Sequence, residues 1–322
     1  MPGLGSGGGG WFSLRRMSGV ARTHLRLRPV ALLLLVTGFA CDKPAETEHP
    51  EVAGERCEEV SAESAAISRT GLLATVFNAT AAEYRAAALQ AYATAKVNLD
   101  AALADGMWVA APEQAGDVRD LPPAVILDVD ETVLDNSPYQ AWLAQVGGSF
   151  EPVSWGAWVE ARKARPIPGA VDFTKYAASK GVTVFYVSNR DVSGEAATRD
   201  NLAAHGFPMG DGAEDVVLLK NERPEWGSEK GSRRATVAER YRIVMLVGDN
   251  LGDFTDSSDG SMDQRGAVVE HHGDFWGSRW VMIPNPMYGD WVKAAVGGAA
   301  PKTPLDREEA LLRPVMTWDG PG

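Results

Sequence analysis

The densest group of chemically active side chains follows the apolar run at 124–127. Asp128 and Asp130 stand two residues apart in the segment 125–137, which reads VILDVDETVLDNS. Alternate residues of a strand point to the same side, so both carboxylates can face one site. A carboxylate beside a hard cation such as Mg²⁺ can attack phosphorus while a second acid protonates the leaving alkoxide. The spacing therefore predicts phosphoryl-transfer chemistry with Asp128 and Asp130 in different roles.

An acidic turn or a calcium-binding loop is the alternative interpretation of this segment. An EF-hand loop that begins at Asp128 needs Gly at its sixth position and Glu at its twelfth. The chain has Val133 and Tyr139 at these positions. This mismatch argues against an EF-hand and favours the catalytic interpretation.

A second pair of acids follows another apolar run, at 243–247. Asp249 and Asp253 lie four residues apart in the segment VGDNLGDF, and Gly248 allows a turn directly before Asp249. Taken alone, an acidic loop after a strand is commonly only a solvated surface. Together with the first pair it predicts that Asp249 and Asp253 reach the same metal.

Polar and cationic residues after two further apolar runs could bind phosphate oxygens. Ser188 and Asn189 follow the run at 182–187 and can donate hydrogen bonds. A lysine can neutralise the charge that spreads over the oxygens of a transferring phosphoryl group. Lys220 and Lys230 are the candidates, and the pattern leaves open which of them contacts phosphate.

Short apolar runs alternate with helical segments from residue 121 onward, which is typical of parallel strands covered by helices on both faces. The expected strands are 124–127, 182–187, 216–219, 243–247 and 280–283. The expected helices between them are 169–180, 194–205 and 232–240. We therefore predict a doubly wound, Rossmann-like α/β fold whose ligand site lies at the carboxyl ends of the strands.

The Ala-rich segment 61–120 precedes this core and predicts one long helix or two consecutive helices. An insertion at about 135–166 is expected to form a small cap. We expect the helical segment and the insertion together to roof the strand ends, which would admit small substrates and exclude bulk water.

The four polar segments, in this order, resemble the haloacid dehalogenase (HAD) superfamily. Within it they are similar to the class C acid phosphatases of the lipoprotein e(P4) type, which are 5′-nucleotidases. The similarity extends over residues 60–292. It includes the stretches DVDETVLDNSPY from Asp128, SNR from Ser188, GDN from Gly248 and PNPMYGD from Pro284.

The resemblance implies roles for individual residues. Asp128 matches the nucleophile that forms an aspartyl phosphate, and Asp130 matches the general acid and base. The implied Mg²⁺ ligands are the Asp128 side chain, the Asp130 carbonyl and the Asp249 side chain, with Asp253 holding metal-bound water. Lys230 matches the phosphate-binding lysine.

Substrate binding is also implied by the resemblance. Ser188 matches a hydroxyl that contacts phosphate, with Asn189 beside it. Trp155 and Tyr288 stand where such phosphatases hold a nucleoside base between aromatic rings. Stacking tolerates any flat ring, so broad selectivity among 5′-nucleotides would follow. Gly252 departs from the pattern, since many relatives carry Asp or Asn there.

The amino-terminal residues predict export. Arginines precede an apolar run at 30–36 and small residues precede Cys41, which is the layout of a bacterial signal peptide over 1–40. Lipidation of Cys41 would anchor the chain in the outer membrane, and simple cleavage would leave it in the periplasm or at the cell surface. Residues 41–60 are polar and predict a flexible tether.

The domain limits and the net charge indicate which partners to expect. The expected catalytic domain covers 61–292, with its core at 121–292, and a loosely packed tail rich in Gly, Ala and Pro follows at 293–322, with a short helix around 308–312. The net charge of −12 gives no positive field for a nucleic-acid polymer. The sequence leaves open whether the chain forms a homodimer.

Two other function classes also stay open. A noncatalytic surface binding or storage protein can be built on the same fold. A phosphotransferase would hand the phosphoryl group to an alcohol instead of water. The substrate predicted by the first interpretation is a small phosphomonoester or nucleotide.

Overall fold

The structure is a computed structural model that describes residues 71–298 and 303–318. The predicted signal peptide at 1–40, Cys41 and the tether at 41–60 lie outside the described residues, and so does the first part of the expected helical segment.

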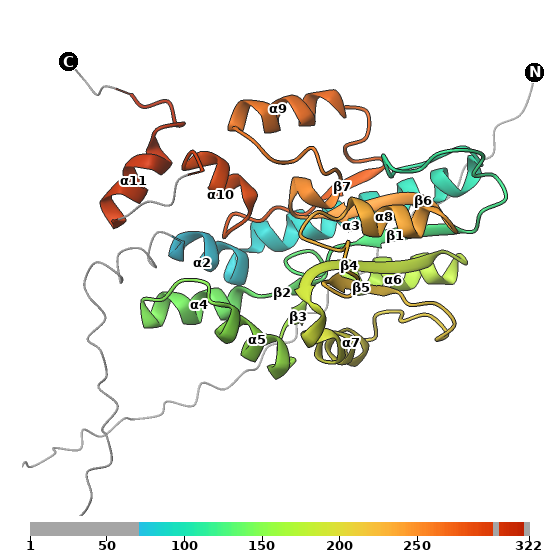
Figure 1. The fold of residues 1–322 in the computed structure, drawn as a ribbon, viewed down its shortest axis with the longest axis horizontal. Helices are drawn as coiled ribbons and strands as arrows, with labels where there is room; N and C mark the ends of the chain where they lie inside the picture. The colour runs from blue at the N-terminus through green and yellow to red at the C-terminus, as the bar shows by residue number, and fades with distance from the viewer. Residues whose placement is uncertain (1–70, 299–302, 319–322) are drawn as a thin grey trace, which may run out of the picture. The chain divides into compact units, whose positions relative to one another are not determined.

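A five-stranded parallel sheet forms the centre of the described chain (Figure 1). Its order is β5-β4-β1-β6-β7, so β1 lies in the middle, between β4 and β6. The strands are β1 (Pro123–Leu127), β4 (Thr183–Asp191), β5 (Val217–Lys220), β6 (Arg242–Gly248) and β7 (Trp280–Met282). The predicted α/β fold is confirmed.

The strands are almost continuous apolar runs because both faces of the sheet are covered. Every residue of β6 is buried, and in β1 only Pro123 is partly exposed. The parallel register places the last residues of β1 beside β4 and β6, with Leu127 opposite Tyr186 and Val247. The residues that follow these strands consequently meet at one edge.

Helices cover both faces of the sheet. α6 (Ala170–Ser179) and α7 (Glu195–Ala204) lie in the connections from β1 to β4 and from β4 to β5, which run one way along the sheet. α8 (Gly231–Ala238) and α9 (Met262–His271) lie in connections that run the other way, from β5 to β6 and from β6 to β7. Because such connections are right-handed, the two pairs of helices lie on opposite faces.

Two consecutive helices precede the sheet in the part of the chain that begins at residue 71. α2 (Leu72–Thr80) and α3 (Ala82–Ala104) are separated by Ala81, whose backbone is extended. α3 packs against α6, β6 and β7. Its buried residues recur every three or four positions, as expected of a helix with one apolar face, and are Tyr84, Ala88, Tyr92, Ala95, Leu99 and Ala102.

The insertion after β1 contains two helices on a short ribbon. β2 (Leu134–Asp135) pairs antiparallel with β3 (Arg165–Pro166) at its base. Between them lie α4 (Ser137–Val146) and α5 (Pro152–Ala161). α4 packs against α2, and α5 packs against α7.

The chain after β7 forms two further helices, α10 (Asp290–Ala295) and α11 (Pro304–Leu312), which contact each other. The expected helix around 308–312 begins earlier because Thr303 and Asp306 form a capping box: each side chain accepts a hydrogen bond of 3.1 Å from the other's backbone N–H. Ala310 is buried, so this part of the predicted loose tail is packed.

Two short 3₁₀ turns also lie among the described residues, η1 (Val192–Gly194) after β4 and η2 (Leu251–Asp253) after β6. Among the described residues, no helix combines the length and the apolar character needed to cross a bilayer.

Candidate active site

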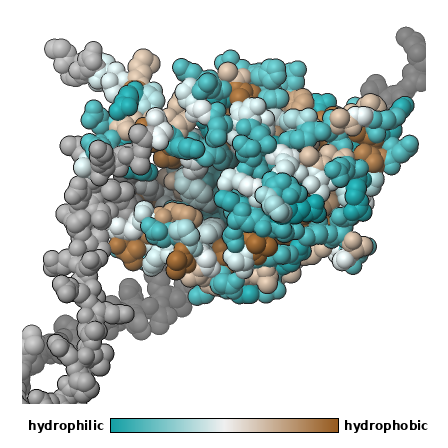
Figure 2. Space-filling model, viewed as in Figure 1, coloured by the Kyte–Doolittle hydropathy of each residue, from teal (hydrophilic) through white to brown (hydrophobic). Residues whose placement is uncertain are grey.

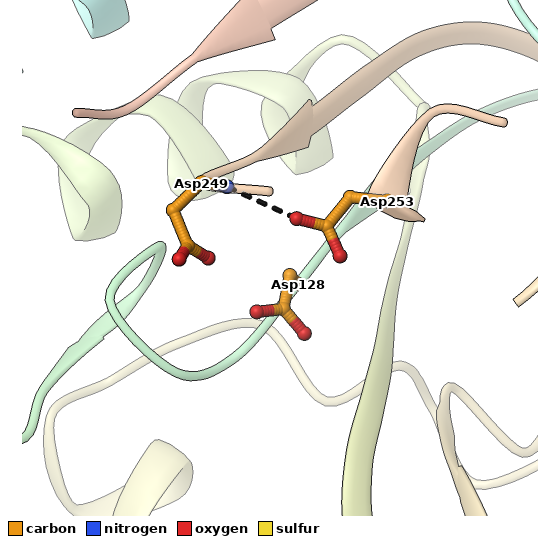
Figure 3. A group of neighbouring side chains, drawn as sticks. All are labelled: Asp128, Asp249 and Asp253. Carbon is orange, nitrogen blue, oxygen red and sulfur yellow. Dashed lines mark hydrogen bonds between the residues drawn. The ribbon is translucent and has the colours of Figure 1, made fainter. Parts of the chain in front are cut away.

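Three carboxylates meet at the carboxyl edge of the sheet. Asp128 follows β1, Asp249 follows β6, and Asp253 ends η2. One oxygen from each side chain lies within 4.8 Å of the others. Figure 3 shows the three side chains lying next to one another. The sequence-predicted acids from two distant segments are thus brought together.

The position of Asp253 is fixed by the turn after β6. Its Oδ2 accepts hydrogen bonds from the backbone N–H groups of Asp249, at 3.0 Å, and Asn250, at 2.8 Å. A β-carbon at Gly248 would overlap the Asp253 side chain. Position 248 therefore requires glycine, because the Asp253 side chain lies too close for any β-carbon there. This explains why Gly248 precedes Asp249 in the sequence.

Lys230 is the cation of this cluster. Its ammonium donates hydrogen bonds to Asp128 and to Asp253, the latter at 2.7 Å, and the residue is 5% exposed. Lys220 instead donates to the Ser228 hydroxyl at 2.9 Å on the surface. Of the two candidate lysines, the structure places Lys230 beside the acids.

Asp130 faces a different set of groups. Arg190 donates to its carboxylate through Nη2 at 2.7 Å and Nε at 3.0 Å, and Asn136 donates at 2.9 Å. Ser188 Oγ lies 3.5 Å from the same carboxylate. The two acids of the first motif therefore lie in different environments, as two distinct roles require.

The loop between Asp130 and β2 supports Asp249. Thr132 donates to Asp249 Oδ1 at 3.0 Å, and Asn285 donates to Oδ2 at 2.9 Å. Glu131 is fully buried with a positive φ of 57°. Its carboxylate accepts from the backbone N–H of Asn136 at 2.7 Å and from the Asn136 side chain at 3.1 Å, which closes the loop on itself.

Burial of so many acids shifts their proton affinities. Desolvation, partly offset by Lys230, raises the pKa of Asp128 to about 7. Desolvation and the neighbouring Asp253 and Asp128 raise the pKa of Asp249 well above its usual range. Burial alone would lower the pKa of Lys230, but Asp128 and Asp253 outweigh it and raise it. The site is short of positive charge.

The donor set fits a divalent cation. Three carboxylates around a single ammonium leave excess negative charge, and carboxylate oxygens are the ligands preferred by hard cations such as Mg²⁺. Asp128, Asp249 and Asp253 are the residues that would hold the ion, while the Asp130 side chain is engaged by Arg190. A bound cation would lower the pKa values of the carboxylates that contact it.

A cavity of about 880 Å³ opens over the acids, and Figure 2 shows a hollow in this part of the surface. Asp128, Asp130, Asp249 and Asp253 lie at its base. Residues from α2, α4, α5, α10 and α11, which we call the roof, line part of the remainder, and loop residues line the other part. The predicted substrate residues Trp155, Asn189 and Tyr288 all line the cavity.

Ser188 and Asn189, which were expected to donate to phosphate, already make hydrogen bonds within the protein. Ser188 is fully buried, and its Oγ accepts from the Arg190 N–H at 3.1 Å. Asn189 Nδ2 donates to the Ser228 carbonyl at 2.9 Å, and its Oδ1 accepts from Arg233 at 2.6 Å. Of the pair, only Asn189 is among the residues that line the cavity.

Several residues of the site were not predicted from the sequence to have a functional role. Arg190 binds Asp130, Thr132 and Asn285 bind Asp249, and Glu131 folds the loop. Arg190 directly follows the predicted pair Ser188 and Asn189, so its place in that segment was the available signal. Asn285 lies in the stretch PNPMYGD, which was likewise the available signal, although its partner Asp249 lies 36 residues away.

A family model agrees with this arrangement. The model for acid phosphatases of the HAD superfamily, subfamily IIIB, matches residues 57–291. Among solved structures, the class C acid phosphatase of Bacillus anthracis is 34% identical, with a TM-score of 0.69 over 79% of this chain and 100% of that chain. The same protein with tungstate bound gives a TM-score of 0.68.

Two curated plant proteins are also similar. The stem 31 kDa glycoprotein of Glycine max is 27% identical over 167 residues, which is 51% of this chain and 58% of that protein. Acid phosphatase 1 of Solanum lycopersicum is 27% identical over 172 residues, or 51% of this chain and 57% of that protein. The chain thus spans less than two thirds of the length of these relatives.

Proposed function

Because the chain belongs to the acid phosphatases of HAD subfamily IIIB, we propose that it hydrolyses small phosphomonoesters with Asp128 as nucleophile and Mg²⁺ as cofactor. The observation that carries this proposal is the meeting of Asp128, Asp249 and Asp253 at the carboxyl edge of the sheet, with Lys230 paired to Asp128 and Asp253. A lone acidic loop would not bury a lysine among three acids.

In the first step, an Asp128 oxygen attacks phosphorus as the ester P–O bond breaks. Asp130 gives its proton to the leaving alkoxide, and an aspartyl phosphate remains. Lys230 contributes positive charge where negative charge accumulates on the phosphoryl oxygens. Mg²⁺ held by the acids would supply further charge neutralisation there.

In the second step, Asp130 takes a proton from water as the water oxygen bonds to phosphorus and the bond to Asp128 breaks. Asp128 is then free again and Asp130 is protonated for the next cycle. Arg190 fixes the Asp130 carboxylate through two N–H groups and so sets the direction of proton transfer.

Nucleotides are the proposed substrate class. Trp155 and Tyr288 line the same cavity as Asp128, from α5 and from the loop before α10. Trp155 is held by Tyr139, with ring centroids 5.2 Å apart, so one ring of the proposed pair is positioned before a substrate binds. A flat base between two aromatic rings would stack without a demand for a particular base.

Export is a further proposal, and it rests on the sequence. The basic and apolar residues before Cys41 have the layout of a signal peptide. We propose that the protein acts outside the cytoplasm, with Cys41 lipidated.

The proposed function is tested by phosphate release from 5′-nucleotides, nicotinamide mononucleotide and an aryl phosphate, with and without Mg²⁺. Asp128→Asn should lower kcat by about 10⁴-fold or more, because it removes the nucleophile. Asp120→Asn, an exposed acid before the opposite end of β1, is the matched control and should leave kcat unchanged. A folded, Mg²⁺-loaded wild type without turnover on any substrate would favour a noncatalytic binding protein.

A further inference from the structure

Among the residues that the structure describes, four cationic side chains line the cavity, and they fall into two groups. Lys230 pairs with Asp128 and Asp253, and Arg190 pairs with Asp130. The other two are Lys293 on α10 and Arg307 on α11. Neither of these makes an ion pair with any residue in 71–298 or 303–318.

Arg307 also holds a polar group that lacks a partner. Its Nε is enclosed, and no described residue accepts a hydrogen bond from it. An enclosed N–H donor without an acceptor is costly and calls for an explanation, of which an absent ligand is one. Because α11 is held by its capping box and by buried Ala310, the guanidinium is presented from a packed helix.

The two cations are carried by α10 and α11, the helices that follow the proposed base-binding residue Tyr288 in the chain. Tyr288 precedes α10, and Trp291 in α10 donates from its indole N–H to the Tyr288 carbonyl at 3.2 Å and to the Asn285 carbonyl at 3.1 Å. These bonds tie the Tyr288 loop to the helix that carries Lys293. The base end of a nucleotide that reaches Tyr288 would therefore approach α10 and its neighbour α11.

Acidic side chains that also line the cavity limit which anions could bind to Lys293 and Arg307. Asp259 and Asp290 line it as well, and Asp290 accepts a hydrogen bond of 2.7 Å from Asn250. They repel an anion that does not engage the cations directly. A planar carboxylate can take two parallel N–H groups of a guanidinium and brings a single charge, whereas a phosphate brings up to two.

We propose that Arg307 and Lys293 form a subsite for a carboxylate on the base end of the substrate, remote from the phosphate that is removed. This subsite rests on the proposed phosphatase function and refines its substrate class to carboxylate-bearing nucleotides. The family match ends at residue 291, before both cations, so the subsite is not carried over from the matched segment.

The test compares two nucleotides of nearly equal shape. Nicotinic acid mononucleotide carries a ring carboxylate where nicotinamide mononucleotide carries a carboxamide. Arg307→Gln should lower kcat/KM for the acid by about tenfold, the usual effect of losing one charged hydrogen bond, and leave the amide nearly unchanged. Lys293→Gln should have the same selectivity and a smaller effect, and Arg307→Lys should restore part of the loss.

Arg313→Gln is the matched control, because Arg313 is an exposed arginine at the end of the same helix. It should change neither substrate, and all variants should hydrolyse an aryl phosphate at the wild-type rate. The subsite is wrong if the wild type treats acid and amide alike, or if Arg307→Gln lowers both equally. Absence of phosphate release from every substrate by the wild type would instead refute the proposed function.

Discussion

At the scale of a single residue, Arg190 holds Asp130, the proposed general acid, in place. Its side chain is 1% exposed and donates to Asp130 through Nε and Nη2. We expect Arg190→Gln to lower kcat by at least about tenfold, because the carboxylate loses its charged hydrogen bonds, with a smaller change in KM. Steady-state kinetics on an aryl phosphate would measure this.

The matched control is Arg119→Gln, since Arg119 pairs with Asp117 on the surface and should not affect turnover. A rise in KM with kcat unchanged would contradict the positioning role and make Arg190 a substrate ligand.

The buried acids also predict how the metal-free protein responds to pH. The folded-state pKa of Asp128 is about 7, above its usual 3.8, and that of Asp249 is raised as well. Between these values the folded state holds more protons than the unfolded state. This contribution to stability is complete below 3.8 and is lost as the pH rises through about 7.

We therefore expect the Tm of the metal-free protein to fall by at least about 3 °C between pH 5 and pH 7.5. Mg²⁺ should reduce this fall, because it binds the deprotonated carboxylates. Calorimetry with a chelator and then with Mg²⁺ gives both curves. A fall of the same size in Asp128→Asn would show that other groups cause it.

How far the sequence predicted individual residues depended on their distance from a motif. Asp128, Asp130, Asp249 and Asp253 are local to strand ends, so their meeting at one edge followed from the predicted parallel arrangement of the strands. The side chain that would hold Asp130 could not be predicted, because Arg190 reaches it from β4 across 60 positions. Such contacts depend on register.

At the scale of elements, α3 supports the catalytic loop through one buried hydroxyl. Tyr92 donates a hydrogen bond of 2.6 Å to the carbonyl of Thr132, whose side chain binds Asp249. Tyr92→Phe should lower the free energy of unfolding by about 1–3 kcal/mol, because a buried carbonyl loses its partner. Mg²⁺ affinity should fall with it. Denaturant unfolding and metal titration measure the two effects.

The same helix offers a matched control. Tyr84 Oη is buried without a hydrogen-bond partner among the described residues. Tyr84→Phe should therefore be neutral or stabilising. Equal destabilisation by both substitutions would show that the Tyr92 hydroxyl adds nothing beyond ring packing.

Elements were predicted well where pattern and length agreed. The apolar runs gave all five strands of the sheet within a few residues, because strands buried on both faces need no alternation. The short helix expected around 308–312 lies within α11 (Pro304–Leu312), which begins four residues earlier than expected. This helix is begun by Thr303 and Asp306, a capping pair that composition alone does not show.

At the scale of the whole molecule, every placed site residue lies between Gly71 and Trp318. A chain that begins at Cys57, where the family match starts, is expected to keep the kcat of the full chain. In bacteria, Cys41→Ser should move the activity from the membrane fraction to the soluble exported fraction, if lipidation is the anchor. Cell fractionation with the aryl phosphate assay tests this, and an unchanged distribution would contradict the anchor.

The roof is assembled from three stretches that lie far apart in the sequence: α2 before the sheet, α4 and α5 within the insertion, and α10 and α11 after the last strand. The acids at the base belong to the sheet and its loops. The residues proposed to carry out the reaction and the helices proposed to select the ligand therefore come from separate parts of the chain. Selection, or a protein engineer, can exchange one roof stretch at a time and obtain new preferences from an unaltered chemical centre.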